Sequence, residues 1–329
     1  MASFAKFGND LYTGERSFNF VGRRRIWYTI AFVMIGLSIL LPILRGGFVF
    51  GIEFSGGSEF QISGVAHVDQ QVATDAVLGV VPDATPRVST VGTDSIRVQT
   101  EQLTTDQSTA VRDALATAYD VPAEQVTSSF IGPSWGADIT GAAIRALIVF
   151  VLLAAILMAI YFRTWKMSLA AIVSLFHDMI ITVGVYGAFG FEITPAAVIG
   201  FLTILGYSLY DTVVVFDKIR ENTSEGSGRT FAESVNLAVN QTLVRSINTG
   251  VVAALPVGAI LFIGTTLLGA GTLRDISLAL FVGILIGTYS TIFIGAPFYS
   301  QLREGEPEIA KSTKKVTANS TRTTTGAVR

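Results

Sequence analysis

Six long runs of apolar residues alternate with polar segments along the chain. Each run comes close to the ~20 residues that a helix needs to cross the hydrocarbon core of a bilayer. We therefore predict one membrane-spanning helix before a polar region and five more within 141–300. Their predicted positions are 26–44, 142–162, 167–190, 196–216, 247–268 and 276–298.

The segment 45–140, between the first two spans, has a different pattern. Some stretches alternate apolar and polar residues, which is typical of half-buried strands, and others have helical spacing. The order β-α-β-β-α-β predicts a small α+β domain of the ferredoxin-like type; the alternative is a mere spacer. We predict strands at 57–65, 85–91, 94–100 and 125–131 and helices at 68–81 and 104–119.

The start of this domain, GIEFSGGSEF, predicts a turn with glycine hinges between the first span and the first strand. Glu53 and Glu59 lie in it. Their spacing matches no metal-ligand pattern, so we expect both carboxylates to be solvated.

Three further segments are polar. Residues 1–25 precede the first span, and residues 217–246 pass from the charged DKIREN through SEGSG into a helix. Thr230 with Glu233 three residues later predicts a capping box at that helix start. The tail 301–329 is rich in Thr, Ser and Lys and has almost no large apolar residues, so we predict that it is disordered.

Basic residues gather on one side of the predicted spans. Cytoplasmic loops of membrane proteins carry an excess of Lys and Arg. The short loops on the side of 45–140 hold only Arg274, with Arg45 and Arg145 at span ends. We therefore predict that both termini and 217–246 are cytoplasmic and that 45–140 is extracytoplasmic. The cytoplasmic set is Arg23, Arg24, Arg25, Arg163, Lys166, Lys218, Arg220, Arg229, Arg245, Arg303, Lys311, Lys314 and Lys315.

Composition excludes several functions. Of the 329 residues 50% are hydrophobic and 15% are charged, against about 25% charged in soluble domains. The net charge of −2 gives no general attraction to nucleic acid, and the absence of cysteine excludes disulfides and thiolate sites. No phosphate loop or H-E-x-x-H motif is present. We predict a lipid-embedded protein that is no enzyme and needs no metal or cofactor, driven by a partner or by the membrane potential.

Ionisable residues inside the apolar runs are the strongest functional signal. His177 and Asp178 lie near the middle of the third predicted span, and Asp211 lies in the fourth. A charge at bilayer depth costs ~2.5–3.5 kcal/mol, and such residues usually mark an ion or substrate pathway. Side chains of adjacent helix residues point ~100° apart, so we expect His177 and Asp178 not to touch. Proton relay or gating is one interpretation, and a polar pair that locks helix packing is the other.

Asp211 has a candidate partner in Arg245, which enters the next span from the same side. An ion pair across two helices would be broken by protonation. Alternatively, Arg245 is a cytoplasmic anchor whose head reaches water. Gly206, Tyr207, Ser208 and Thr212 surround Asp211 in sequence and are predicted to serve helix packing or gating. Glycines predicted to permit close helix approach are Gly184, Gly187, Gly200, Gly206, Gly283 and Gly287.

Five motifs together resemble the protein translocase subunit SecF family. They are FGIEFSGGSEF (50–60), IGPSWG (131–136), SLFHD (174–178), GYSLYDTVVVFDKIREN (206–222) and RSINT (245–249). Their order and their placement relative to the six spans also resemble that family, over about 15–303.

The resemblance implies a member of the resistance–nodulation–division superfamily in the cytoplasmic (inner) membrane. It implies partnership with SecD, association with the SecYEG channel, indirect cooperation with SecA, and use of the proton-motive force to promote preprotein translocation. Asp211 matches the family's transmembrane acid and Arg245 its basic residue, while His177 and Asp178 match a recurrent motif. Glu53 stands where the family commonly has Asp.

Two other functions remain open. A self-sufficient proton-coupled exporter of a small molecule or lipid would purify as a homotrimer without SecD. A scaffold that only stabilises the channel complex would need its buried acids for assembly and not for turnover.

Overall fold

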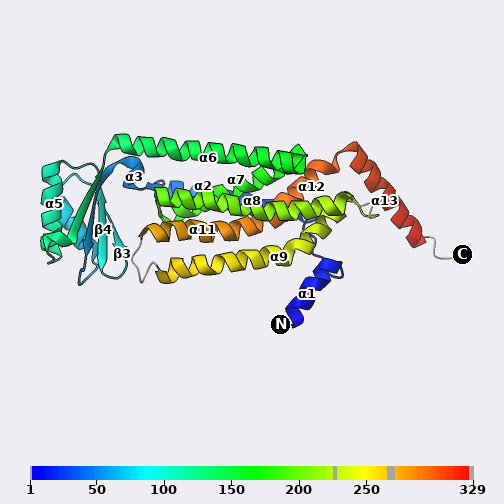
Figure 1. Cartoon of the computed structure of the whole chain (residues 1–329), viewed down its shortest axis with the longest axis horizontal. Coiled ribbons are helices and arrows are strands. Elements are labelled where there is room, and N and C mark those ends of the chain that lie inside the picture. The colour runs from blue at the N-terminus through cyan, green and yellow to red at the C-terminus, as the bar shows by residue number, and fades with distance from the viewer. Residues whose placement is uncertain (1, 225–227, 265–270, 326–329) are drawn as a thin grey trace.

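The computed structural model describes residues 2–224, 228–264 and 271–325 (Figure 1). A bundle of long helices has a small α+β domain at one end, and both chain ends lie toward the other end. Six helical segments of the described residues are long and apolar enough to cross a membrane, as predicted. They are α2 (Arg24–Leu44), α6 (Pro133–Phe162), α7 (Trp165–Phe189), α8 (Pro195–Ser224), α9 (Phe231–Ala259) with the π-helix η2 (Ile260–Gly264), and α11 (Gly271–Ser290) with the π-helix η3 (Thr291–Gly295) and α12 (Ala296–Glu304).

The segment 217–246 is more helical than predicted at its start, while the helix predicted after Thr230 is present. Helix α8 continues to Ser224 and α9 begins at Phe231. Ile219 and Val235 are fully buried, so the apolar faces of both helices continue beyond the hydrophobic runs. The predicted capping box is confirmed, because Thr230 Oγ1 accepts from the Glu233 N–H at 3.3 Å and the Glu233 carboxylate accepts from the Thr230 N–H at 2.8 Å. Residues 225–227 of SEGSG and 265–268 of the fifth predicted span lie outside the described residues.

The tail predicted to be disordered contains helix α13 (Pro307–Thr325). Two ion pairs anchor its start, because Glu306 accepts from Arg303 and from Lys166, each at 2.9 Å. Figure 1 shows α13 projecting away from the bundle. The lack of apolar residues means that the tail has no hydrophobic core. A helix can still form there, because its backbone hydrogen bonds are made within the helix. Residues 326–329 lie outside the described part.

The segment before the first span is held by two asparagines of α9. Asn240, which is 1% exposed, accepts from the Phe18 N–H at 2.7 Å and donates to the Phe18 carbonyl at 2.9 Å. Asn236 accepts from the Phe20 N–H at 2.8 Å. Together they fix an irregular backbone next to helix α1 (Ala2–Thr13), which packs on α9.

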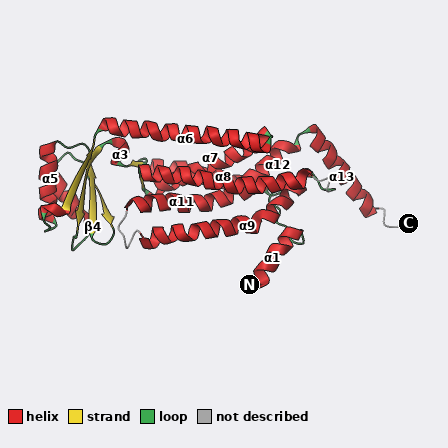
Figure 2. Ribbon diagram, viewed as in Figure 1, coloured by secondary structure: helices red, strands yellow, loops and turns green. Residues whose placement is uncertain are grey.

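The α+β domain has the predicted order of elements. The strands are β2 (Gly57–Ser63), β3 (Arg87–Val91), β4 (Ser95–Thr100) and β5 (Val126–Ile131), and the helices are α4 (Gln70–Val80), α5 (Thr105–Ala118) and the 3₁₀ turn η1 (Ala123–Gln125). The sheet order is β3-β4-β2-β5, and every neighbouring pair is antiparallel. Figure 2 shows the helices of this domain on the side of the sheet away from the bundle. Phe60, Ile62, Ile96 and Val98 are fully buried in the core of the domain.

Strand alternation gives the sheet a second, polar face. Residues alternate between two faces along a strand, so Glu59 and Gln61 of β2 lie opposite to Phe60 and Ile62. Glu59 pairs in register with Gln99 of β4, and Gln61 pairs with Arg97. This polar face carries side chains that reach a connection between two of the long helices.

A short parallel pair of strands lies between the domain and the bundle. Strand β1 (Val49–Phe50) pairs with β6 (Glu192–Ile193), and the sequence pattern predicted neither. The helix α3 (Ile52–Ser55) leads from β1 into β2, in the predicted glycine-hinged turn. Gly57 has φ 148°, and a Cβ there would lie 2.4 Å from the Thr100 carbonyl oxygen, so only glycine fits.

Glu53 and Glu59 are less solvated than predicted. Both are half-buried, and among the described residues Glu53 Oε2 is buried without a hydrogen-bond partner. Glu59 accepts a hydrogen bond from Gln99 at 3.0 Å. The close approach of the α+β domain to the bundle, which no local pattern encodes, covers both carboxylates. Burial raises the pKa of Glu53, the charges of Glu192 and Glu59 raise it further, and Arg97 opposes them.

We expect Glu53→Gln to stabilise the protein at alkaline pH more than at acidic pH. A carboxyl whose pKa is raised by folding binds more protons folded than unfolded, so its contribution to stability falls as the pH rises through that interval. Glutamine removes the cost of the buried charge. Thermal unfolding in detergent at a series of pH values measures this, with Glu101→Gln as the exposed control. Equal effects at all pH values would contradict it.

Candidate functional site

Three neighbouring helices bring together several of the predicted site residues with a serine that was not predicted. Helix α7 carries His177 and Asp178, α8 carries Ser208 and Asp211, and α9 carries Ser246. All five are buried, with exposures from 1% to 6%. Ser208 and Asp211 are three residues apart and thus neighbours on α8. The polar side chains therefore form a band that crosses from α7 through α8 to α9.

His177 and Asp178 contact each other, which corrects the prediction that they do not. His177 Nδ1 lies 3.1 Å from Asp178 Oδ1. Nδ1 is close to the backbone, so this nitrogen can reach the neighbouring carboxylate although the two Cβ directions diverge. Asp178 Oδ2 accepts from Ser208 Oγ at 2.5 Å, which ties α7 to α8. His177 Nε2 is buried without a hydrogen-bond partner among the described residues, and its ring centroid lies 6.1 Å from that of Tyr289.

Asp211 is only half satisfied. Ser246 Oγ donates to Asp211 Oδ1 at 2.9 Å, and Oδ2 is buried without a partner among the described residues. A buried polar atom without a partner carries a desolvation cost of ~1–3 kcal/mol, more when it is charged. Asp211 is therefore the acid of this band that has an unpaired buried oxygen within the described part of the chain, and the cost of that oxygen depends on whether the carboxyl group is charged.

Thr212 links α8 to the π-helix η3. Its Oγ1 lies 2.9 Å from the Ser208 carbonyl oxygen and 2.9 Å from Thr291 Oγ1. π-Helical segments often occur at functional sites. The predicted packing role of Thr212 thus includes a contact between helices in addition to the bond to its own helix.

Arg245 forms no ion pair with Asp211 among the described residues, contrary to the predicted pair. The contact goes to the next residue, Ser246, because Arg245 lies on the exposed side of α9. Arg245 lines a polar pocket of about 410 Å³ between α1, α8 and α9. The pocket is lined by Tyr12, Val214, Asp217, Lys218, Glu221, Gln241, Thr242 and Arg245.

Two other predicted residues differ in their surroundings. Tyr207 has a buried hydroxyl without a partner among the described residues, and it lies one helical turn before Asp211. Gly206 is exposed, and a Cβ there would meet nothing within 4 Å, so it makes no close helix contact within the described part of this chain. The helix faces that pack closely lie on the other side of α8. Gly287 of α11 lies close to this packed side of α8, since a Cβ at Gly287 would lie 3.1 Å from Ser208 Oγ.

Sequence reasoning missed two partners within the site. Ser246 holds Asp211, and Thr291 meets Thr212. Each is a small hydroxyl residue at or within an apolar run, which is only a weak signal because such residues often bond their own helix. No cluster of three or more His, Asp or Glu able to hold a metal occurs among the described residues.

Comparisons with known proteins point to one family. Residues 110–305 match the family described as "Protein export membrane protein SecD/SecF, C-terminal". The protein translocase subunit SecF of Streptomyces coelicolor is 44% identical over 322 residues, which cover 97% of this chain and 85% of that relative.

Longer relatives match over part of their length. The protein translocase subunit SecDF of Thermus thermophilus is 32% identical over 295 residues, which are 84% of this chain and 37% of that protein. A crystal structure of SecDF, "a translocon-associated membrane protein", superposes with a TM-score of 0.77 at 28% identity. The match covers 88% of this chain and 39% of that one.

Proposed function

The chain belongs to the protein translocase subunit SecF family, and from this premise we propose that it uses the proton-motive force to promote preprotein translocation. It is a multi-pass membrane protein with a role in protein export. The observation that carries the proposal is Asp211, a buried acid with one oxygen satisfied by Ser246 and the other without a partner among the described residues. Such an acid can take up and release a proton between two arrangements of α8 and α9.

The route of the proton would follow the polar band. The membrane potential supplies ~2.3 kcal/mol per charge per 100 mV. The movement of one proton can therefore favour one arrangement of hydrogen bonds over another. Asp178 is already bonded to both His177 and Ser208, and it would hold α7 against α8 while Asp211 changes its charge. Arg245, in its polar pocket, would approach Asp211 when the carboxylate is ionised.

We place the α+β domain outside the cytoplasmic membrane and both termini in the cytoplasm. Figure 1 shows the junction of α6 and α7 at the end of the bundle away from the domain, and Arg163 and Lys166 at this junction support the orientation through the positive-inside rule. We also assign the domain to the ferredoxin-like type. Its β-α-β-β-α-β order and antiparallel sheet order β3-β4-β2-β5 support that assignment.

A SecD-type chain is the proposed direct partner. The name of the SecDF relative combines SecD and SecF, and this chain matches 37% of the length of that relative. An apolar groove of about 570 Å³ lies between α9 and α11. Gly250, Ala254 and Gly258 line it at spacings of four residues, which suits the close approach of a second membrane helix. SecYEG, and SecA through it, would be the further partners.

Preprotein export into inverted vesicles tests the function. Vesicles would contain SecYEG and SecD, with or without this chain, and ATP and SecA would be constant while the proton-motive force is switched on and off. We expect the chain to increase export only when the force is present. An equal increase without the force would favour a scaffold, and no increase at all would contradict the function.

A further inference from the structure

The connection between the two acid-bearing helices is tied to the α+β domain. Helix α7, with Asp178, ends at Phe189, and α8, with Asp211, begins at Pro195. The link between them contains β6, which pairs with β1 at the entrance to the domain. The Gly51 N–H adds a bond of 3.0 Å to the Ile193 carbonyl.

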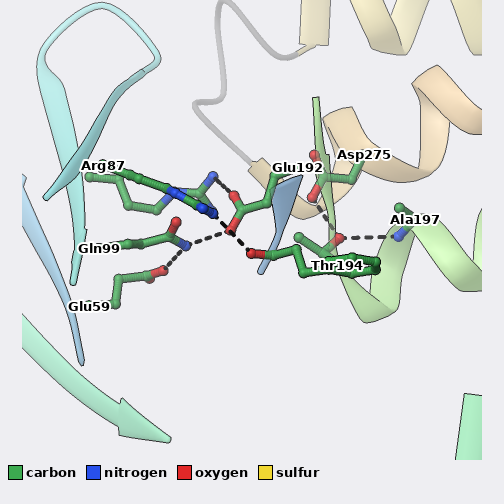
Figure 3. A network of polar contacts seen from close by, with 9 residues as sticks. Glu59, Arg87, Gln99, Glu192, Thr194, Ala197 and Asp275 are labelled. Carbon is green, nitrogen blue, oxygen red and sulfur yellow. Dashed lines mark hydrogen bonds and ion pairs between the residues drawn. The ribbon is translucent and has the colours of Figure 1, made fainter. Parts of the chain in front are cut away.

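Side chains from the polar face of the sheet converge on one residue of this link. Figure 3 shows Gln99 with its amide directed at the carboxylate of Glu192. Arg97 Nη2 lies 2.7 Å from Glu192 Oε2, and Gln99 Nε2 lies 2.7 Å from Glu192 Oε1. Gln99 also donates to Glu59 at 3.0 Å, so its amide joins two carboxylates.

The same link is bonded to a third membrane helix. Thr194 Oγ1 donates to Asp275 Oδ2 at 2.8 Å and accepts from the Ala197 N–H at 3.2 Å (Figure 3). Tyr186 near the end of α7 donates to the Asp275 carbonyl at 2.6 Å. Asp275 lies in the first turns of α11. The ends of α7, α8 and α11 therefore meet at residues 192–194.

Burial makes these contacts stronger than ordinary surface bonds. The side chains of Arg97 and Glu192 are 23% and 12% exposed, and Gln99 is 8% exposed. Exposed ion pairs contribute little, but removing one partner of a shielded pair leaves the other without compensation. Two carboxylates, a guanidinium and an amide with matched geometry favour one relative position of domain and bundle.

We propose that Arg97, Gln99, Glu192, Thr194 and Asp275 form a coupling joint that transmits movement of the acid-bearing helices to the α+β domain. Glu192 is its central positioning residue, because it accepts from both Arg97 and Gln99 and lies in the strand that connects α7 with α8. The inference rests on the proposed function. It adds that the domain moves together with the ends of α7, α8 and α11 and not independently of them.

The functional test uses Glu192→Gln, which keeps the shape of the side chain and removes its charge. Export into vesicles with SecD would be measured with the proton-motive force on and off. We expect the force-dependent part to fall at least about threefold, as an interaction of this kind permits. The double variant Arg97→Glu with Glu192→Arg restores opposite charges and should recover part of it. Asp113→Asn, which breaks the exposed pair with Arg112 in the same domain, is the control.

A structural readout separates a joint from a merely stabilising contact. The chain has no cysteine, so spin labels at Thr109→Cys on α5 and Ser224→Cys at the end of α8 are unambiguous. We expect a narrow distance distribution that broadens in Glu192→Gln and narrows again in the charge-swapped variant. An unchanged distribution with unchanged force-dependent export would overturn the joint. Should the unmodified chain itself lack force-dependent export, the proposed function fails, and the distance measurement still decides whether the joint exists.

Discussion

We expect the Asp211→Asn variant to lose the force-dependent part of preprotein export while the ATP-driven part remains. Asparagine can still accept the hydrogen bond from Ser246, at 2.9 Å in the native chain, so the packing of α8 on α9 is kept. It cannot take up or release a proton. Because positioned proton transfer commonly contributes a factor of 10²–10⁴, we expect the force-dependent component to fall at least about tenfold.

The measurement is export into inverted vesicles at equal amounts of chain and SecD, with the force on and off. Asp211→Glu keeps an ionisable group and should retain partial activity. Asp138→Asn removes an exposed acid at the start of α6 and is the matched control. If Asp211→Asn keeps its response to the force in an assembled complex, the acid is structural and the scaffold becomes the better explanation.

Gly184→Val should disrupt the contact between α2 and α7. A Cβ at Gly184 would lie 2.2 Å from the Ser38 Cβ and 2.7 Å from the Ser38 Cα, so the two helices would have to separate. Overpacking of this kind costs ~1–3 kcal/mol or more. We expect a lower melting temperature in detergent and less full-length chain in the membrane.

Gly36→Val on α2 is the control for this substitution. A Cβ at Gly36 would meet nothing within 4 Å, and Gly36 is exposed. It introduces the same side chain and the same loss of glycine on the partner helix. Equal melting temperatures for the Gly184 and Gly36 variants would show that the α2–α7 contact can relax without cost.

Local periodicity was enough to predict the membrane helices and most elements of the domain. Strand β4, for example, was visible in DSIRVQT because alternation along a strand is a property of neighbouring residues. The start of α9 was visible in Thr230 and Glu233, since a capping box involves only four residues. The candidate acids were visible because charge is rare in apolar runs.

The contacts of those residues could not be predicted in the same way. Asp211 bonds Ser246 and Glu192 bonds Arg97, partners that lie 35 and 95 residues away. Their choice depends on helix rotation and on how the domain is seated. Asn236 and Asn240 were missed for the same reason, because an asparagine inside a helix gives no sign of which distant backbone it will hold.

The parallel pair β1–β6 has a consequence for the order of folding. It joins residues 49–50 to residues 192–193, whereas the four-stranded sheet is complete at residue 131. During synthesis the domain can therefore form its core before the second span exists. The strand that ties it down is made only after the third span. A newly made chain can thus hold a folded domain whose contacts with β6 form only after α7 has been made.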